Sequence, residues 1–338
     1  MVKADYIVGS IEQLEQLDKS VVCVVTPEKN AEYEFSRLSK HFAIVINIKE
    51  LREIVSLVNF IPIAHNDWNW NAYCPFGRYD SPYISQNSKE YEIYKNSVET
   101  RPLGIDFREE KQVELLNELK SYYESFYSDV KNKKGMRYRA DNTYFEGCDA
   151  ALLYSIFRIY RPKTYIEIGS GHSTAVALDT NEWYFDKKVK IVSIEPYPDR
   201  LLSILKDPNE VVLIKKCVQE VNLNIFETLS EGDIVFIDSS HTAKMGGDIP
   251  YEYFEILPRL RKGVIIHIHD IFYPFTYPER WIKDGRCYNE TFIVRALLMN
   301  NKDYEILFFN DMMTKLHYKE YNKISDYLGG GSIWLRKN

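Results

Sequence analysis

The chain has 338 residues, of which 45% are hydrophobic and 27% charged, and its formal net charge is −6. This balance is typical of a soluble globular protein with room for more than one folded unit, and it argues against a nucleic-acid partner, which usually needs a clustered basic face. No apolar run reaches the roughly 18 residues of a membrane-spanning helix, the N-terminus lacks the apolar stretch of a signal peptide, and the five cysteines are widely spaced, so we expect a cytoplasmic protein with reduced thiols.

Residues 1–60 alternate short apolar runs with polar segments of helical pattern. The pattern predicts strands at 21–25 and 42–48 and helices at 10–18, 30–40 and 49–58. No catalytic motif lies in this region. We therefore predict a small N-terminal α/β unit that serves docking or oligomerisation rather than chemistry.

The segment 61–146 is predicted to be an aromatic lid loop followed by a helical cap over the substrate. The loop part, residues 61–106, is far longer than an ordinary connection, and loops of that length are usually functional or disordered. Its many aromatic residues argue against disorder. Aromatic rings beside Asn and Asp side chains suit the apolar faces and hydroxyl edges of sugars, so Trp68, Trp70 and Tyr83 are candidate substrate contacts. A loop fixed to the core by its aromatic side chains would explain the pattern equally well.

Helices predicted at 108–130 and 147–160 lead into the most informative stretch, Thr164–Leu178, with the sequence T-Y-I-E-I-G-S-G-H-S-T-A-V-A-L. It predicts a buried strand, a glycine turn and a helix with Ser173 and Thr174 at its N-cap, which is the nucleotide-binding corner of a doubly wound sheet. Glycine permits close backbone approach, and the helix N-terminus faces the ligand. A dinucleotide site would need a third glycine where Thr174 stands, so binding of NAD is disfavoured.

After this corner the chain repeats strand and helix to its end. Strands are predicted at 190–194, 211–214, 234–237, 264–268, 304–309 and 332–336, and helices near 198–206, 248–260 and 289–300. We predict a doubly wound, Rossmann-like α/β core over 147–338, with a seven-stranded, mostly parallel sheet and an antiparallel C-terminal hairpin.

The run E-I-G-S-G closely resembles motif I of class I S-adenosylmethionine (SAM) methyltransferases, which use this loop to hold the methionine and ribose of SAM. The resemblance implies that SAM is the cofactor and that residues of this loop contact it, namely Glu167, Gly169, Ser170, Gly171 and Ser173. Glu195 ends the second core strand, where an acidic side chain should accept hydrogen bonds from the ribose hydroxyls. Gln219, or its neighbour Glu220, is a candidate for the adenine edge, with a solvated loop residue as the alternative.

The fourth core strand ends in D-S-S-H, at the topological switch point where ligands bind in such sheets. Methyl transfer to a hydroxyl needs an aligned nucleophile and a group that removes the proton. We therefore predict that Asp238 contacts the cofactor and is a catalytic residue. We also predict that His241, with an ordinary pKa of ~6.5, is the general base. The alternative is a capping aspartate beside a structural histidine.

The fifth core strand ends in H-I-H-D, which places His267 and His269 on one face and Asp270 beyond them. Asp238, His269 and Asp270 are candidate ligands of a divalent metal ion, with Asp270 also a candidate catalytic residue. The spacing is similar to that of metal-dependent O-methyltransferases, including those of macrolide sugars, where acidic residues bind magnesium and a histidine is the base. His269 departs from the carboxylate or amide found there, and histidine favours softer metals; without a metal, Asp270 would position the substrate.

A second aromatic loop follows at 270–290 and adds Tyr273 and Tyr277 as candidate substrate contacts. The motifs I-E-I-G-S-G-H-S-T, I-E-P-Y-P, F-I-D-S-S-H and H-D-I-F-Y-P-F-T-Y-P, with Asn289-Glu290, resemble a bacterial O-methyltransferase-like subgroup of class I enzymes that is often linked to surface glycans. We predict a SAM-dependent O-methyltransferase acting on a sugar or glycan hydroxyl. The alternatives are O- or N-methylation of another small molecule and a non-catalytic SAM-binding scaffold. The sequence leaves the acceptor, the metal and a homo-oligomeric state open.

Overall fold

The computed structural model describes residues 22–25, 44–47, 82, 84–97, 100–323 and 329–338. The chain divides into two compact units, Met1–Asn96 and Ser97–Asn338. In the first unit β1 (Val22–Val25) and β2 (Ile44–Asn47) pair as parallel strands, which confirms the two predicted strands, and α4 spans Lys89–Asn96.

Several predictions for the N-terminal part lie outside the described residues. They are the helices at 10–18, 30–40 and 49–58 and the substrate contacts Trp68, Trp70 and Tyr83. The division of residues 1–146 into a docking unit and a substrate cap therefore stays a prediction.

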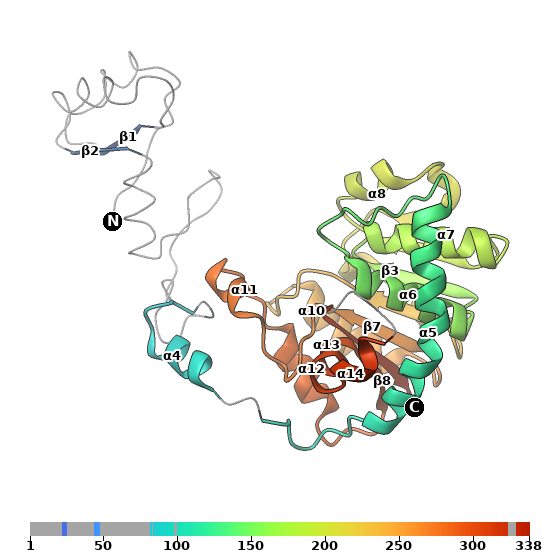
Figure 1. The fold of residues 1–338 in the computed structure, drawn as a ribbon. Helices are drawn as coiled ribbons and strands as arrows, with labels where there is room; N and C mark the ends of the chain where they lie inside the picture. The colour runs from blue at the N-terminus through green and yellow to red at the C-terminus, as the bar shows by residue number, and fades with distance from the viewer. Residues whose placement is uncertain (1–21, 26–43, 48–81, 83, 98–99, 324–328) are drawn as a thin grey trace, which may run out of the picture. The chain divides into compact units, whose positions relative to one another are not determined.

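The second unit is built on a seven-stranded sheet with the order β5-β4-β3-β6-β7-β9-β8. Three of these strands, β3, β7 and β8, are labelled in Figure 1. The strands of the sheet are β3 (Thr164–Ile168), β4 (Lys190–Ile194), β5 (Val212–Ile214), β6 (Ile234–Ile237), β7 (Ile265–His269), β8 (Tyr304–Phe309) and β9 (Ser332–Lys337). The first five are parallel, and β9 pairs antiparallel with both β7 and β8. The predicted doubly wound sheet with an antiparallel C-terminal hairpin is confirmed.

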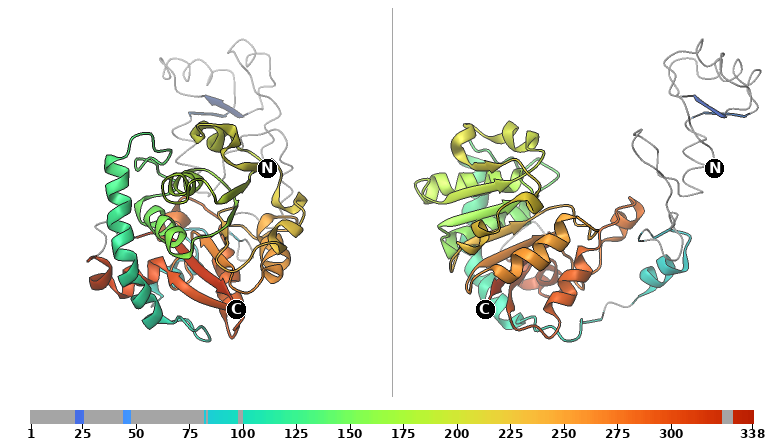
Figure 2. Two further views of the ribbon diagram at one scale, coloured as in Figure 1. Left: turned by 90° about the vertical axis from the view of Figure 1, so that its right-hand side faces the viewer. Right: turned by 180° about the vertical axis from the view of Figure 1, so that it is seen from behind.

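Helices cover both faces of this sheet (Figure 2). They are α5 (Glu109–Asn132), α6 (Gly147–Tyr160), α7 (His172–Tyr184), α8 (Asp199–Ile204), α9 (Asn224–Glu227), α10 (Asp248–Tyr251), α11 (Glu279–Lys283), α12 (Glu290–Leu298), α13 (Asn310–Leu316) and α14 (Tyr318–Tyr321). Helices α5, α6 and α7 pack side by side, and α10 and α12 lie across the sheet from them. None of the helices in the described part of the chain combines the length and apolar character needed to cross a membrane.

The predicted helix at 248–260 is wrong as one continuous element. After α10 the chain passes through a π-helical turn, Glu252–Ile256, and a 3₁₀ turn, Leu257–Arg259. Pro258 lacks the N–H that a continuing α-helix would use, which explains why the regular helix does not persist. Such π-helical turns often occur at functional sites, and this one carries a buried acid, Glu252.

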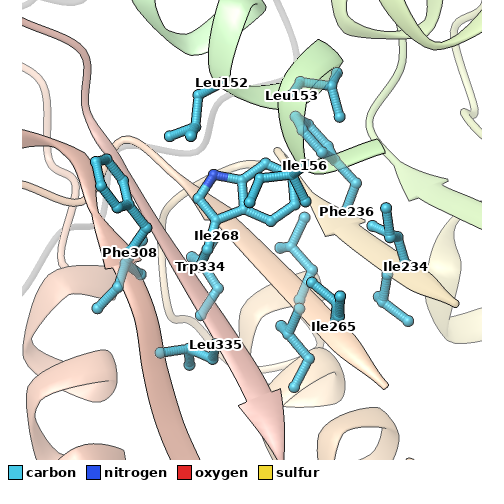
Figure 3. Close-up of a cluster of buried hydrophobic side chains, with 14 of the residues drawn as sticks. Leu152, Leu153, Ile156, Ile234, Phe236, Ile265, Ile268, Phe308, Trp334 and Leu335 are labelled. Atoms are coloured by element: carbon cyan, nitrogen blue, oxygen red, sulfur yellow. The ribbon is translucent and has the colours of Figure 1, made fainter. Parts of the chain in front are cut away.

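The core of the unit lies between α6 and the centre of the sheet. The α6 side chains Leu152, Leu153 and Ile156 face Phe236 of β6 and Trp334 of β9 (Figure 3), and all five are buried. Each large apolar side chain buried in this way contributes about 1.5–3 kcal/mol. The central strands are therefore firmly fixed, and their carboxyl ends provide a rigid edge for a functional site.

Candidate active site

The glycine loop after β3 is shaped by its contact with the end of β6. Gly169 has a φ of +80°, and a Cβ at this position would lie 1.8 Å from the carbonyl oxygen of Asp238. Only glycine combines this backbone conformation with such a close approach. The first glycine of the motif therefore holds the loop directly against the residue that follows β6.

The helix after the loop begins earlier than predicted. Gly171 is its N-cap, His172 is its first residue, and Thr174 stands at the third helical position rather than at the cap. The Thr174 hydroxyl accepts a hydrogen bond from the Gly171 N–H at 3.1 Å and donates one to Glu167. Glycine is an acceptable N-cap residue, and the threonine side chain replaces the capping contact from inside the helix.

Glu167 supports this loop from within the core. It is fully buried and accepts a hydrogen bond from the Tyr165 hydroxyl at 3.0 Å in addition to the one from Thr174. Burial raises the pKa of Glu167 to about 8. Its position gives Glu167 an indirect part in cofactor binding, because it fixes the loop without reaching the pocket surface.

A pocket of about 430 Å3 opens at the carboxyl ends of β3, β4 and β6. Four residues predicted to bind SAM line it: Gly169, Glu195, Gln219 and Asp238. The other four predicted contacts are outside this lining: Glu167, Ser170, Gly171 and Ser173. The pocket thus unites the glycine loop with the ends of three strands, as the sequence predicts.

The Glu195 carboxylate is oriented by the backbone around it. One oxygen accepts the Ser170 N–H at 3.1 Å and the other accepts the Tyr197 N–H at 2.9 Å. Each carboxylate oxygen can accept a further bond, so Glu195 remains able to receive two hydroxyl groups. Across the pocket the Gln219 amide donates to the Gly246 carbonyl at 2.9 Å and so links two of its walls.

A compact charged centre adjoins this pocket and consists of Asp238, His241 and Asp270. The His241 Nε2 lies 3.2 Å from the Asp238 Oδ1 and 3.3 Å from the Asp270 Oδ2. His241 and Asp270 both adopt left-handed backbone conformations, with φ values of 56° and 57°. Such conformations are costly for residues other than glycine and gather at functional sites. Asp238 belongs to both the pocket and the charged centre.

The His241 ring is held in place by Glu290, the first residue of α12. The His241 Nδ1 lies 2.8 Å from the Glu290 Oε2, and the Tyr253 hydroxyl donates to the Glu290 Oε1 at 2.7 Å. The N–H groups of Asn289 and Glu290 also donate to the His241 carbonyl, at 3.0 and 3.2 Å. The sequence motifs contain Glu290 without indicating a role for it, and its place at the start of a predicted helix is the available signal.

The surroundings of His241 change its expected protonation. Its Nδ1 faces Glu290, and its Nε2 faces one oxygen each of Asp238 and Asp270. The Nε2 therefore either carries a proton or binds a cation together with these two oxygens. Burial alone would lower the pKa of His241, but the hydrogen bonds to Asp238 and Glu290 outweigh it and raise the pKa well above 6.5. The ordinary pKa assumed from the sequence is therefore wrong.

The two carboxyl groups of the centre are shifted in opposite directions. Burial would raise the pKa of Asp238, but the neighbouring His269 and His241 lower it below the usual value. For Asp270 burial dominates, and its pKa is raised. Asp238 is thus held as an anion, whereas Asp270 takes up a proton more readily.

Of the three predicted metal ligands, the structure brings Asp238 and Asp270 into one close group and leaves His269 outside it. One ligand atom from each of Asp238, His241 and Asp270 lies within 4.8 Å of the other two, and this group contains His241 in place of His269. The His269 Nε2 is 3.6 Å from the Asp270 Oδ1, but its ring packs against Phe145. The sequence missed His241 as a ligand because it assigned that side chain to proton transfer.

His267 has a different character from the residues of the charged centre. It is fully buried and stacks on Phe236 with ring centroids 3.8 Å apart, on the same face as His269, as strand alternation predicts. Burial lowers its pKa well below the usual value. His267 is therefore a neutral packing residue.

The predicted aromatic substrate contacts that the structure describes lie mainly in the interior. Tyr273 is 6% exposed, and Tyr277 is 9% exposed and stacks on Trp281. Tyr288 is only partly buried, and its ring centroid lies 5.0 Å from that of His241. Among these aromatic rings, Tyr288 is the best placed to meet an acceptor.

Comparison with known proteins indicates a methyltransferase domain. Residues 166–271 match the family model of a methyltransferase domain. An uncharacterised protein of Archaeoglobus fulgidus is 36% identical over 150 residues, which cover 43% of this chain and 67% of that protein. The family match supports SAM-dependent methyl transfer as the reaction class.

Two solved structures of methyltransferases are also similar to the chain. The SAH-bound methyltransferase PaMTH1 of Podospora anserina is 17% identical, with a TM-score of 0.37 over 79% of this chain and 99% of that one. The plantazolicin methyltransferase BpumL, bound to SAH and a triazolic desmethylPZN analog, is 15% identical, with a TM-score of 0.38 over 67% of this chain and 99% of that one.

Proposed function

With residues 166–271 matching a methyltransferase domain, we propose that the protein transfers the methyl group of SAM to a hydroxyl oxygen of a small molecule. The proposal rests on the position of Asp238, which belongs to both sites. Its side chain lines the pocket, and its Oδ1 lies 3.2 Å from the His241 Nε2 in the charged centre. A methyl donor and a hydroxyl acceptor must meet in line, and Asp238 is the residue that the two sites share.

The pocket suits SAM in three respects. The loop at Gly169 admits close backbone approach, the Glu195 carboxylate can accept the ribose hydroxyls, and Asp238 is an anion beside the place for a cationic ligand. When bound, SAM supplies an electrophilic methyl group on a sulfonium leaving group. The protein then needs only to align the acceptor and remove its proton.

Two side chains of the charged centre can take that proton, His241 and Asp270. His241 accepts it only when its own Nε2 is deprotonated, which its raised pKa opposes near neutral pH. Asp270 is the stronger base of the two carboxylates because burial raises its pKa. Both lie within one hydrogen-bonded group, so the acceptor oxygen can be held and deprotonated in the same place.

The same three side chains fit a divalent metal ion. The separations of 3.2 and 3.3 Å from the His241 Nε2 are close to the ~3.0 Å between adjacent ligands at right angles around an ion at ~2.1 Å. The other ring nitrogen faces a carboxylate, as is usual for metal-binding histidines. A bound ion would lower the pKa of the acceptor hydroxyl.

We favour a sugar or glycan-derived hydroxyl as the acceptor. Tyr288 offers a ring beside His241, and the carboxylates of Asp238 and Asp270 offer hydrogen-bond acceptors, a combination that suits the apolar face and hydroxyl edge of a sugar. Another small molecule methylated on oxygen or nitrogen is the alternative. A non-catalytic SAM-binding scaffold is disfavoured because it would not need two strained residues in a charged centre.

The proposal is tested with labelled SAM and a panel of nucleotide sugars, catechols and amines. We expect label to enter a hydroxyl-bearing acceptor, and Asp270→Asn to abolish transfer while SAM binding measured by calorimetry is retained. EDTA should stop turnover and a divalent ion should restore it. SAM binding without transfer to any acceptor would favour the scaffold, and full turnover after exhaustive chelation would leave the centre a positioning role alone.

A further inference from the structure

We propose that Glu290 is a positioning residue that commits His241 to metal ligation, so that the Asp238–His241–Asp270 centre selects a first-row transition ion over Mg2+. The inference rests on the proposed function only in placing this centre beside the methyl donor. The geometry that points to it is the double fixation of His241, through its ring and through its backbone.

Glu290 is rigidly placed. It is fully buried, and both of its carboxylate oxygens are engaged, one by the His241 Nδ1 at 2.8 Å and the other by the Tyr253 hydroxyl at 2.7 Å. Its backbone N–H donates to the His241 carbonyl at 3.2 Å. The ring can therefore neither rotate nor exchange its two nitrogens without breaking contacts at the start of α12.

This fixation determines which nitrogen is available to a ligand. A carboxylate is an acceptor only, so the His241 Nδ1 must carry the hydrogen that it shares with Glu290. The Nε2 then faces the Asp238 and Asp270 oxygens at 3.2 and 3.3 Å. In the neutral ring, the Nε2 lone pair faces two carboxylate oxygens, which repel it. A cation bound between these three atoms would make the arrangement favourable.

The donor set differs from an all-oxygen magnesium site. It contains one imidazole nitrogen and two carboxylates, and imidazole suits first-row transition ions such as Fe2+ and Zn2+ better than Mg2+, which takes oxygen ligands. A site made of oxygen ligands alone would need a third carboxylate at position 269, and a histidine stands there instead. Its Nε2 lies 3.6 Å from the Asp270 Oδ1, outside the group of mutually close ligand atoms.

If the centre holds no metal ion, the opposite result is expected for metal binding. In that case His241 is an imidazolium that donates from Nδ1 to Glu290 and from Nε2 to Asp238 and Asp270, and added metal ions have no place to bind. Metal binding by the full-length protein therefore distinguishes the two arrangements without any need for the methyl acceptor.

The experiment titrates the purified full-length protein with Mn2+ and follows the free ion by electron paramagnetic resonance, with Mg2+ as competitor. We expect one tight Mn2+ site from which Mg2+ displaces the ion only in large excess. Glu290→Gln should weaken Mn2+ binding by roughly 10–100-fold, the usual cost of losing the partner of a metal-binding histidine. Histidine side-chain ¹⁵N spectra of the Zn2+-loaded wild type should show a protonated Nδ1 and a metal-bound Nε2, whereas part of the variant should bind the ion through Nδ1 and show the opposite tautomer.

Glu252→Gln is the matched control. Glu252 is also fully buried but contacts Ser239 rather than His241, and burial raises its pKa well above 4.5, so glutamine replaces a neutral acid of similar shape. We expect Mn2+ affinity to stay unchanged in this variant. Circular dichroism and SAM calorimetry on each variant identify any that fails to fold.

Three results would overturn the inference. Wild-type protein that binds no Mn2+ would make His241 an imidazolium, and equal competition by Mg2+ would remove the selectivity. A folded Glu290→Gln variant with wild-type Mn2+ affinity and tautomer would remove the positioning role. The proposed function fails separately, through absence of SAM binding or of methyl transfer.

Discussion

The two halves of the active-site edge are built in contrasting ways. The donor half uses the glycine loop after β3 and the Glu195 carboxylate, and its polar contacts are largely to backbone N–H groups. The acceptor half uses charged side chains that face one another, and it assembles residues 238, 241, 270 and 290 from three separate segments.

The difference follows from what each half must do. A cofactor that is bound and released needs a complementary shape and hydrogen-bonding groups, which a local loop and a strand-end carboxylate can supply. A centre that handles a proton or a cation needs close charges in a buried place, where their pKa values are shifted. Such a cluster has to be held by the surrounding fold, as the buried Glu290 and the left-handed backbone at His241 illustrate.

The largest expected effect is at Gly169, where the two halves touch. Gly169→Ala would place a Cβ 1.8 Å from the Asp238 carbonyl oxygen, so β3 and β6 must separate at their ends. We expect a loss of roughly 4–5 kcal/mol in unfolding free energy and loss of SAM binding, measured by urea denaturation and calorimetry. The control is Gly135→Ala, which has a similar φ of +77° but no atom within 4 Å; an equal loss there would assign the effect to backbone strain alone.

His241→Ala tests whether the halves are separable. We expect kcat to fall by about 10²–10⁴-fold while SAM affinity changes little, because His241 touches the acceptor half only. His269→Gln should lower kcat less than His241→Ala does, since His269 lies outside the group formed by Asp238, His241 and Asp270. If His241 acts as the base, its raised pKa means that kcat rises with pH well above 6.5, where the ring loses its proton. A variant with wild-type kcat would make His241 structural.

Glu195→Ala is the corresponding test of the donor half. Removing the acceptor of two hydroxyl groups should weaken SAM binding by roughly 1–3 kcal/mol, and Mn2+ binding should be unaffected. Glu195→Gln keeps the shape and one acceptor oxygen, so calorimetry should give an intermediate loss. Unchanged SAM affinity in both variants would defeat the assignment of Glu195 to the ribose.

The remaining test concerns the pH dependence of stability at Glu167, which supports the donor half from within the core. Its pKa rises from 4.5 to about 8 on folding, so the native state binds the proton more tightly than the unfolded state does. Its contribution to stability is therefore lost as pH rises from about 4.5 to about 8, at up to roughly 1.4 kcal/mol per pH unit. Glu167→Gln should lack this decline in urea denaturation at pH 5.5 and 8; identical pH dependence in both proteins would contradict the assignment.

The sequence by itself determined the features that depend on neighbouring residues. The strand, glycine turn and helix at 164–178 predicted the corner of the sheet, and strand-end positions identified Glu195 and Asp238 as pocket residues. A seven-stranded, mostly parallel sheet with an antiparallel C-terminal pair also followed, because repeated strand–helix units and the right-handed crossover rule leave few arrangements. These inferences hold because strand and turn formation are largely local.

Only the tertiary structure decided the chemistry of the charged centre. Sequence spacing brought Asp238, His241 and Asp270 to one edge but could not reveal that Glu290, 49 residues beyond His241, lies 2.8 Å from its ring. Nor could it show that Glu167 is buried behind the loop rather than exposed in the pocket. The physical reason is that protonation and metal preference depend on burial and on distances of a few ångström between charges, and those are set when distant segments pack together.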